Sequence, residues 1–101
     1  MIRDAESLSI GPHRLRNSVL LAPMSGVSDL PFRRLADELG AGLVVSEMIA
    51  SEELVRERPD VGRRAAGEGL SPFVIQLAGR EARWMAEGAR VAEAAGADII
   101  D

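Results

Sequence analysis

The chain of 101 residues contains no cysteine, no tyrosine and no lysine, and only 3% of its residues are aromatic. The absence of cysteine excludes disulfides, thiolate metal sites and a cysteine nucleophile within these residues. No apolar run approaches the roughly 18 to 20 residues that a membrane-spanning helix needs, and the polar N-terminus does not have the pattern of a secretory signal. We therefore expect a cytoplasmic protein with no metal and no membrane partner, held together by packing alone.

Acidic residues outnumber basic ones by 16 to 12, so the formal net charge is -4. This balance argues against a surface that coats nucleic acid in general, although it leaves room for a local basic patch. All the basic residues are arginine, whose planar group can pair bidentately with phosphate. We attribute this usage to biased base composition of the coding sequence. With 47% hydrophobic residues, the chain has enough apolar material for one core.

The first third of the sequence predicts a hairpin, a strand and a helix. Short strand-like pieces at 7–10 and 14–16 flank the turn dipeptide Gly11-Pro12, and the apolar run 19–22 predicts a strand buried on both faces. Ser28 or Asp29 can then cap a helix that ends before Gly40. The apolar positions of this helix are Phe32, Leu35, Ala36 and Leu39. We expect them to face the core, and the opposite face, with Arg33 and Arg34, to be exposed.

The rest of the sequence alternates strands with helices. Strands are predicted at 43–45, 73–77 and 98–101, helices at 51–56 and 82–95, and a surface connection at 59–69. Such alternation with continuous apolar strands is typical of a parallel sheet with helical crossovers, so the fold class is α/β. The strands start about 24, 30 and 25 residues apart, which fits a (β/α)8 barrel.

A complete (β/α)8 barrel has roughly 250 residues, so we expect the chain to be the N-terminal half of one, preceded by the short hairpin. A doubly wound domain is the alternative architecture. The last predicted strand has no following helix to cover it, which indicates a chain cut short with open sheet edges. Such edges could support self-association.

Residues that follow the predicted strands are the candidates for a site, because ligands of parallel α/β folds bind at the carboxyl ends of strands. The segment from Pro23 to Gly26 can lay main-chain groups and the Met24 side chain against a flat ring system. Gln76 offers a donor and an acceptor, which suits the edge of a flavin ring or a nucleobase. An amide in an apolar run costs desolvation free energy unless it is paired.

Three segments carry a resemblance to a known family. They are LAPMSGVSDLPFRRLADELGAGLVVSEM at 21–48, FVIQLAG at 73–79 and AEAAGADIID at 92–101. Together they resemble the N-terminal half of the tRNA-dihydrouridine synthases of a bacterial branch. The resemblance implies an FMN-dependent TIM-barrel enzyme that reduces uridine in tRNA to 5,6-dihydrouridine with NADPH or NADH. On this basis, residues 1–101 are a partial FMN-binding TIM-barrel catalytic domain.

The resemblance also assigns roles to particular residues. Pro23, Met24 and Ser25 match the family's flavin-contacting loop, Gln76 matches the glutamine that bonds the flavin ring, and Glu47 lies at the substrate pocket. The family's catalytic cysteine, in a Gly-Cys-Pro loop, lies beyond Asp101, as does the C-terminal helical domain that binds tRNA. No catalytic residue is therefore expected within this chain, and we expect it to be inactive alone.

Two other functions stay open from the sequence. One is another FMN-dependent TIM-barrel oxidoreductase, such as a relative of dihydroorotate dehydrogenase, which the PFRR and SEM elements weigh against. The other is a non-catalytic half-barrel that acts as an interaction module by covering its open edges with a partner.

Overall fold

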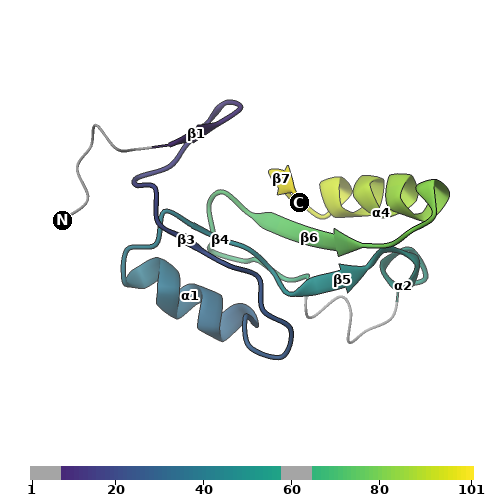
Figure 1. Cartoon of the computed structure of the whole chain (residues 1–101), viewed down its shortest axis with the longest axis horizontal. Helices are drawn as coiled ribbons and strands as arrows, with labels where there is room; N and C mark the ends of the chain where they lie inside the picture. The colour runs from purple at the N-terminus through teal and green to yellow at the C-terminus, as the bar shows by residue number, and fades with distance from the viewer. Residues whose placement is uncertain (1–7, 58–64) are drawn as a thin grey trace.

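A computed structural model of the chain describes residues 8–57 and 65–101, and Figure 1 shows the order of its elements. The elements are β1 Ser9–Ile10, β2 His13–Arg14, β3 Leu20–Leu21, α1 Leu30–Glu38, β4 Leu43–Val44, β5 Met48–Ala50, α2 Ser51–Val55, β6 Val74–Ala78, α4 Ala82–Ala94 and β7 Ile99–Ile100. None of the helices in this described part has the length and apolar character needed to cross a bilayer.

The strands after the hairpin form parallel pairs, as the sequence predicted. β3 pairs with β4, and β5, β6 and β7 are neighbours in that order. The Ser46 N–H donates to the Val74 carbonyl at 3.3 Å, so the segment between β4 and β5 also lies against β6. Helix α1 joins β3 to β4 and α4 joins β6 to β7, which makes these units parallel strands with helical crossovers. The predicted α/β class is thus confirmed.

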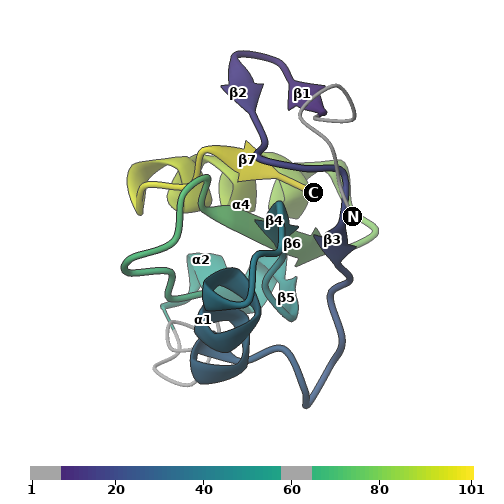
Figure 2. The same cartoon turned by 90° about the vertical axis from the view of Figure 1, so that its left-hand side faces the viewer.

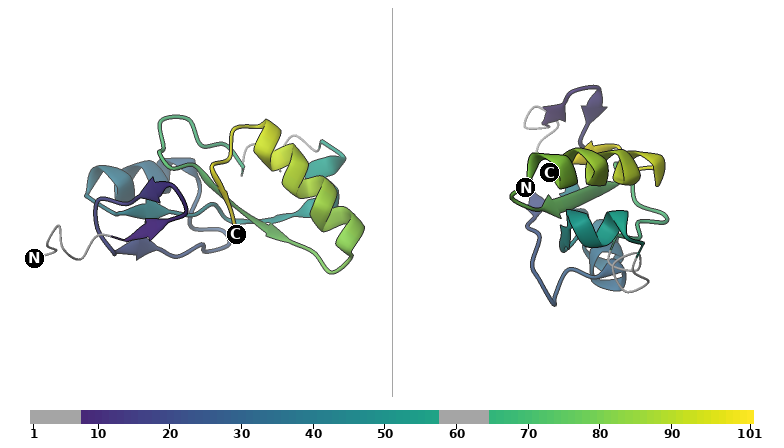
Figure 3. Two further views of the ribbon diagram at one scale, coloured as in Figure 1. Left: turned by 90° about the horizontal axis from the view of Figure 1, so that it is seen from above. Right: turned by 90° about the vertical axis from the view of Figure 1, so that its right-hand side faces the viewer.

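The strands carry apolar clusters on both faces. On the helix face, β5 and β6 pack against α2 and α4, through the buried residues Ile49, Leu54, Ile75, Leu77 and Ala92. Helix α4 lies beside α2 and β6 in Figure 3. On the opposite face, at the N-terminal ends of the strands, the hairpin contributes Leu15 to a second cluster with Leu43, Val45 and Val74.

The predicted hairpin is confirmed. β1 and β2 pair antiparallel around Gly11, whose φ of +56° lies in the left-handed region, and the Leu15 N–H donates to the Leu8 carbonyl at 2.8 Å. The hairpin stands off the sheet in Figure 2. The first part of the predicted 59–69 connection lies outside the described residues, whereas Ala65 and Leu70 are buried.

The expectation that the first strand is buried on both faces is wrong. Leu20 is 44% exposed, and Ile100 of β7 is also exposed. In the described structure, β3 pairs only with β4 and β7 only with β6, so each has one free edge. These strands border an apolar hollow of about 470 Å³, which is lined by Ile10, Leu20, Leu21, Ala22, Pro23, Leu43, Val45, Val74, Ile99, Ile100 and Asp101.

Helix α1 begins where predicted, because the Asp29 carboxylate accepts from the Phe32 N–H at 3.0 Å. Its predicted orientation is wrong. Arg33 is completely buried, whereas Leu39 is 80% exposed and Phe32 and Leu35 are also exposed.

Backbone carbonyls explain this reversal, because they surround the Arg33 guanidinium. Nε of Arg33 donates to the Ser28 carbonyl at 3.0 Å, and Nη2 donates to the Ala66 carbonyl at 2.8 Å. Arg34 remains exposed, but it also bonds the connection, through the Glu68 carbonyl. A buried charge is tolerated when its donors find acceptors, and periodicity does not reveal where those acceptors are.

Candidate functional site

Parallel pairing brings Gln76, which the sequence singled out, to the same level of the sheet as one residue on each side. Met48 lies opposite Gln76 in the pairing of β5 with β6. On the other side of Gln76, the Asp101 N–H donates to the Ile75 carbonyl and its carbonyl accepts from the Leu77 N–H, both at 2.9 Å. Residues at one level of a parallel sheet point to the same face. Met48, Gln76 and Asp101 therefore form a row on one face of the sheet.

The side chain of Gln76 has a partner within this row. Its Nε2 donates to Oδ2 of Asp101 at 2.9 Å, which lowers the cost of placing an amide in an apolar strand. Among the described residues no donor engages its Oε1. The amide is therefore held with its carbonyl oxygen available to accept a hydrogen bond from a ligand.

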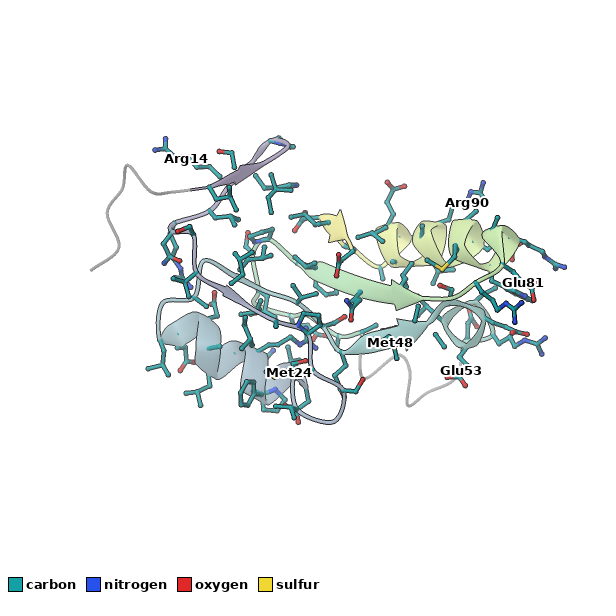
Figure 4. The ribbon with its side chains drawn as sticks, in the orientation of Figure 1. Arg14, Met24, Met48, Glu53, Glu81 and Arg90 are labelled. Carbon is teal, nitrogen blue, oxygen red and sulfur yellow. The ribbon has the colours of Figure 1, made fainter. Side chains whose placement is uncertain are left out.

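The loop between β3 and α1, residues 22–29, is a preformed turn. The carbonyl of Met24 accepts from the N–H groups of Val27 and Ser28, at 3.0 and 2.9 Å. The buried Ser28 hydroxyl accepts from the Met24 N–H at 2.8 Å and donates to the Met24 carbonyl at 3.1 Å. Met24 lies on this loop in Figure 4 and is 37% exposed. The loop thus presents a methionine on a fixed backbone.

Glu47 lies in the irregular segment 45–47, between β4 and β5. Leu43 and Val45 belong to the hairpin-side cluster, whereas Ile49 belongs to the helix-side cluster, so the alternation of side chains shifts across the irregular segment 45–47. Only 9% of Glu47 is exposed, and its Oε1 accepts from the Gly26 N–H at 2.7 Å. The carboxylate is therefore engaged with the β3–α1 loop, and its predicted place in the substrate pocket stays a prediction.

Two further buried side chains, those of Ser46 and Arg33, lie around Glu47. The Ser46 hydroxyl donates to the Glu47 carbonyl at 2.9 Å and accepts from the Gln76 N–H at 3.0 Å. Burial lowers the pKa of Arg33 from its usual value, and the negative charges of Glu47 and Asp29 oppose this effect. The positive charge of Arg33 is thus attracted by the negative charge of the buried Glu47 carboxylate.

Sequence reasoning identified some of these residues and missed others. Ser46 and Met48 follow a predicted strand and Asp101 ends another, so they had a signal, whereas nothing in the sequence indicated the buried hydrogen bonds of Arg33 and Ser28. Pro23 is half-buried and lines the apolar hollow, and Ser25 is exposed on the β3–α1 loop. The described residues contain no group of three or more acidic or histidine side chains that could hold a metal ion.

Parallel strands joined by helical crossovers place the protein in the parallel α/β class, whose ligands bind at the carboxyl ends of the strands. The particular family follows from comparison with known sequences. The profile of the family described as Dihydrouridine synthase (Dus) matches residues 20–101. The chain therefore belongs to the dihydrouridine synthase family.

Curated relatives match over most of this chain. A probable tRNA-dihydrouridine synthase of Rhizobium leguminosarum bv. phaseoli is 59% identical over 87 residues, covering 86% of this chain and 27% of the relative. One of Rhodobacter capsulatus is 52% identical, covering 94% of this chain and 30% of the relative. The tRNA-dihydrouridine synthase B of Escherichia coli K12 is 43% identical, with shares of 93% and 30%. The chain spans less than a third of these relatives.

Proposed function

We propose that this chain forms the flavin-binding part of a tRNA-dihydrouridine synthase, which reduces uridine in tRNA to 5,6-dihydrouridine with FMN and with NADPH or NADH. The family membership and the names of the relatives support the reaction and the tRNA substrate. A tRNA substrate in turn favours the cytoplasm. The observation that carries the proposal is the row of Met48, Gln76 and Asp101 across adjacent parallel strands.

The chemistry of the described residues fits a flavin ring. Met48 is 51% exposed and lies beside Gln76, so a flat ring bonded by the Gln76 amide would lie against the Met48 thioether. Met24 offers a second exposed thioether from the β3–α1 loop, and the Gln76 Oε1 can accept from a ring N–H. We propose Pro23, Met24, Ser25 and Gln76 as flavin contacts, with Met48 added to them.

FMN, when bound, supplies the hydride for the uracil ring. The residues of this chain bind and orient the flavin, and the exposed thioethers exclude water from one side of the ring. The resemblance assigns the proton that completes the reduction to a cysteine, and these 101 residues contain none. We therefore propose that these 101 residues alone do not catalyse the reaction.

The partial barrel belongs to the same proposal. Its support is the parallel order of the described strands, the helices on one face and the apolar hollow on the other. In a (β/α)8 barrel that hollow is part of the interior, which further strands and their side chains fill.

Substitution of Gln76 tests the proposed site. In the complete protein encoded by the gene, Gln76→Ala should raise the dissociation constant for FMN about tenfold, because a ring N–H loses its acceptor. Flavin fluorescence titration measures this constant. Arg90→Ala, on the exposed face of α4, is the control and should leave it unchanged. An FMN affinity that is the same in wild type and Gln76→Ala would contradict the proposed contact.

A further inference from the structure

The backbone of the β3–α1 loop is bonded by two charged side chains, one in the middle of its turn at Gly26 and one at its end at Ser28. Glu47 accepts from the Gly26 N–H at 2.7 Å, and Arg33 donates from Nε to the Ser28 carbonyl at 3.0 Å. The two side chains come from different elements, the irregular segment after β4 and helix α1. Both are buried, so these hydrogen bonds lie where water competes least.

Burial makes the Glu47 contact selective for one loop conformation. A buried carboxylate is costly unless donors and a positive charge compensate it, and Gly26 and Arg33 supply these. The Gly26 N–H meets the carboxylate with a left-handed backbone at Gly26, at φ +75°. A loop that moved away would leave the carboxylate without this donor.

We infer that Glu47 is a positioning residue, which holds the Gly26 N–H while Arg33 holds the Ser28 carbonyl, so that together they fix the β3–α1 loop against the flavin. The inference deepens the proposed function and rests on it for the identity of the ligand. It assigns Glu47 to the cofactor side of the site, away from direct contact with the substrate.

The arrangement has a consequence for Ser25. Among the described residues no acceptor engages the Ser25 N–H, and Ser25 is exposed. With Gly26 held by Glu47 and Met24 held by Ser28, the Ser25 N–H lies between two fixed peptide groups. It is therefore a preorganised donor for a ring carbonyl or ring nitrogen, and it does not depend on the serine hydroxyl.

The test compares variants of Glu47 that separate charge from reach, in the complete protein. Glu47→Gln keeps an acceptor oxygen at the same distance but removes the charge. Glu47→Asp keeps the charge but shortens the side chain, and Glu47→Ala removes both. Glu38→Ala, which alters an exposed carboxylate on α1, is the matched control. Two quantities are measured: the dissociation constant for FMN, and amide hydrogen exchange of the peptide that spans the β3–α1 loop in the flavin-free protein.

We expect Glu47→Ala and Glu47→Asp to speed exchange in the loop and to weaken FMN binding, each by about tenfold. Glu47→Gln should change both by less than about threefold, and Glu38→Ala should match wild type. If Glu47→Ala does not fold, the order of Glu47→Asp and Glu47→Gln decides the question. Equal FMN affinities for these two variants, or weaker binding by Glu47→Gln, would overturn the inference.

The experiment separates this inference from the proposed function. If wild type bound no FMN, the proposed function would fail, and the exchange data would still show whether Glu47 holds the loop. If Glu47→Ala lost uridine reduction with FMN affinity and loop exchange unchanged, Glu47 would act on the substrate and the positioning role would be wrong.

Discussion

At the scale of the residue, the site depends on polar groups that are buried and bonded to backbone. Glu47, Ser28, Ser46 and Arg33 all bond main-chain atoms, and Glu47 and Ser46 do so across neighbouring segments. Each buried group leaves an unsatisfied partner if it is removed, which costs about 1 to 3 kcal/mol. The loop that presents Met24 is therefore specified by residues that are themselves outside the proposed flavin contacts.

A substitution of Gly26 tests how far the site depends on the backbone conformation of the β3–α1 loop. A Cβ at Gly26 would have nothing within 4 Å, so Gly26→Ala adds only the cost of the left-handed conformation, about 1 to 2 kcal/mol. Gly69→Ala is the control, because Gly69 has a φ of +85° and equally open surroundings, but lies on the connection before β6. Thermal unfolding should show a similar loss of stability for both variants.

Only one of the two glycine variants should affect the site. We expect Gly26→Ala to weaken FMN binding of the complete protein about tenfold, since an altered backbone turns the Gly26 N–H away from Glu47. Gly69→Ala should bind FMN as wild type does. Equal FMN affinities in both variants would show that the loop conformation does not matter for the ligand.

At the scale of the element, the helices that cover β5 and β6 pack closely against each other. Ser51, the first residue of α2, is buried, and its hydroxyl lies 3.2 Å from the Met85 sulfur of α4. Gly88 of α4 allows this approach, because a Cβ there would lie 2.9 Å from the Ser51 Cβ. The small residue thus sets how closely α4 packs on α2, and so supports β6, which carries Gln76.

Gly88→Ala should therefore destabilise the fold by about 1 to 3 kcal/mol through overpacking. The helix propensity of alanine, which favours the variant by about 1 kcal/mol, offsets only part of this. Denaturant unfolding measures the change. The double variant with Ser51→Gly removes the opposing Cβ and should recover part of the loss. A Gly88→Ala protein as stable as wild type would show that α4 can shift without cost.

At the scale of the whole molecule, apolar surface remains beside free sheet edges. The hollow of about 470 Å³ is bordered by β3 and β7, each with one paired side in the described structure. Exposed apolar surface next to free backbone groups favours association with another chain. In the proposed enzyme, other strands of the barrel occupy this place.

The 101-residue chain by itself should therefore self-associate. Sedimentation velocity should show a mass that rises with protein concentration, and the double substitution Leu20→Arg with Ile100→Arg at the hollow should reduce it. Leu39→Arg is the control, because Leu39 is exposed directly after α1 and does not line the hollow. A folded monomer at every concentration would contradict this prediction.

Some features of this protein were determined by the sequence alone. Local signals, such as Asp29 at a helix start, Gly11 in a turn and continuous apolar strands between helices, predicted the order of elements and the parallel α/β class. Strand ends then predicted where the candidate site lies, because parallel topology collects them at one edge. The motifs around Met24, Glu47 and Gln76 pointed to the family.

Only the tertiary structure decided which groups meet. The burial of Arg33 and the exposure of Leu39 reverse the helix periodicity, because carbonyls from the loop and the connection converge on the guanidinium. Glu47 reaches Gly26 because the irregular segment after β4 shifts the alternation of side chains. Periodicity describes one element at a time, whereas hydrogen bonds to backbone from distant segments depend on how the elements are placed together.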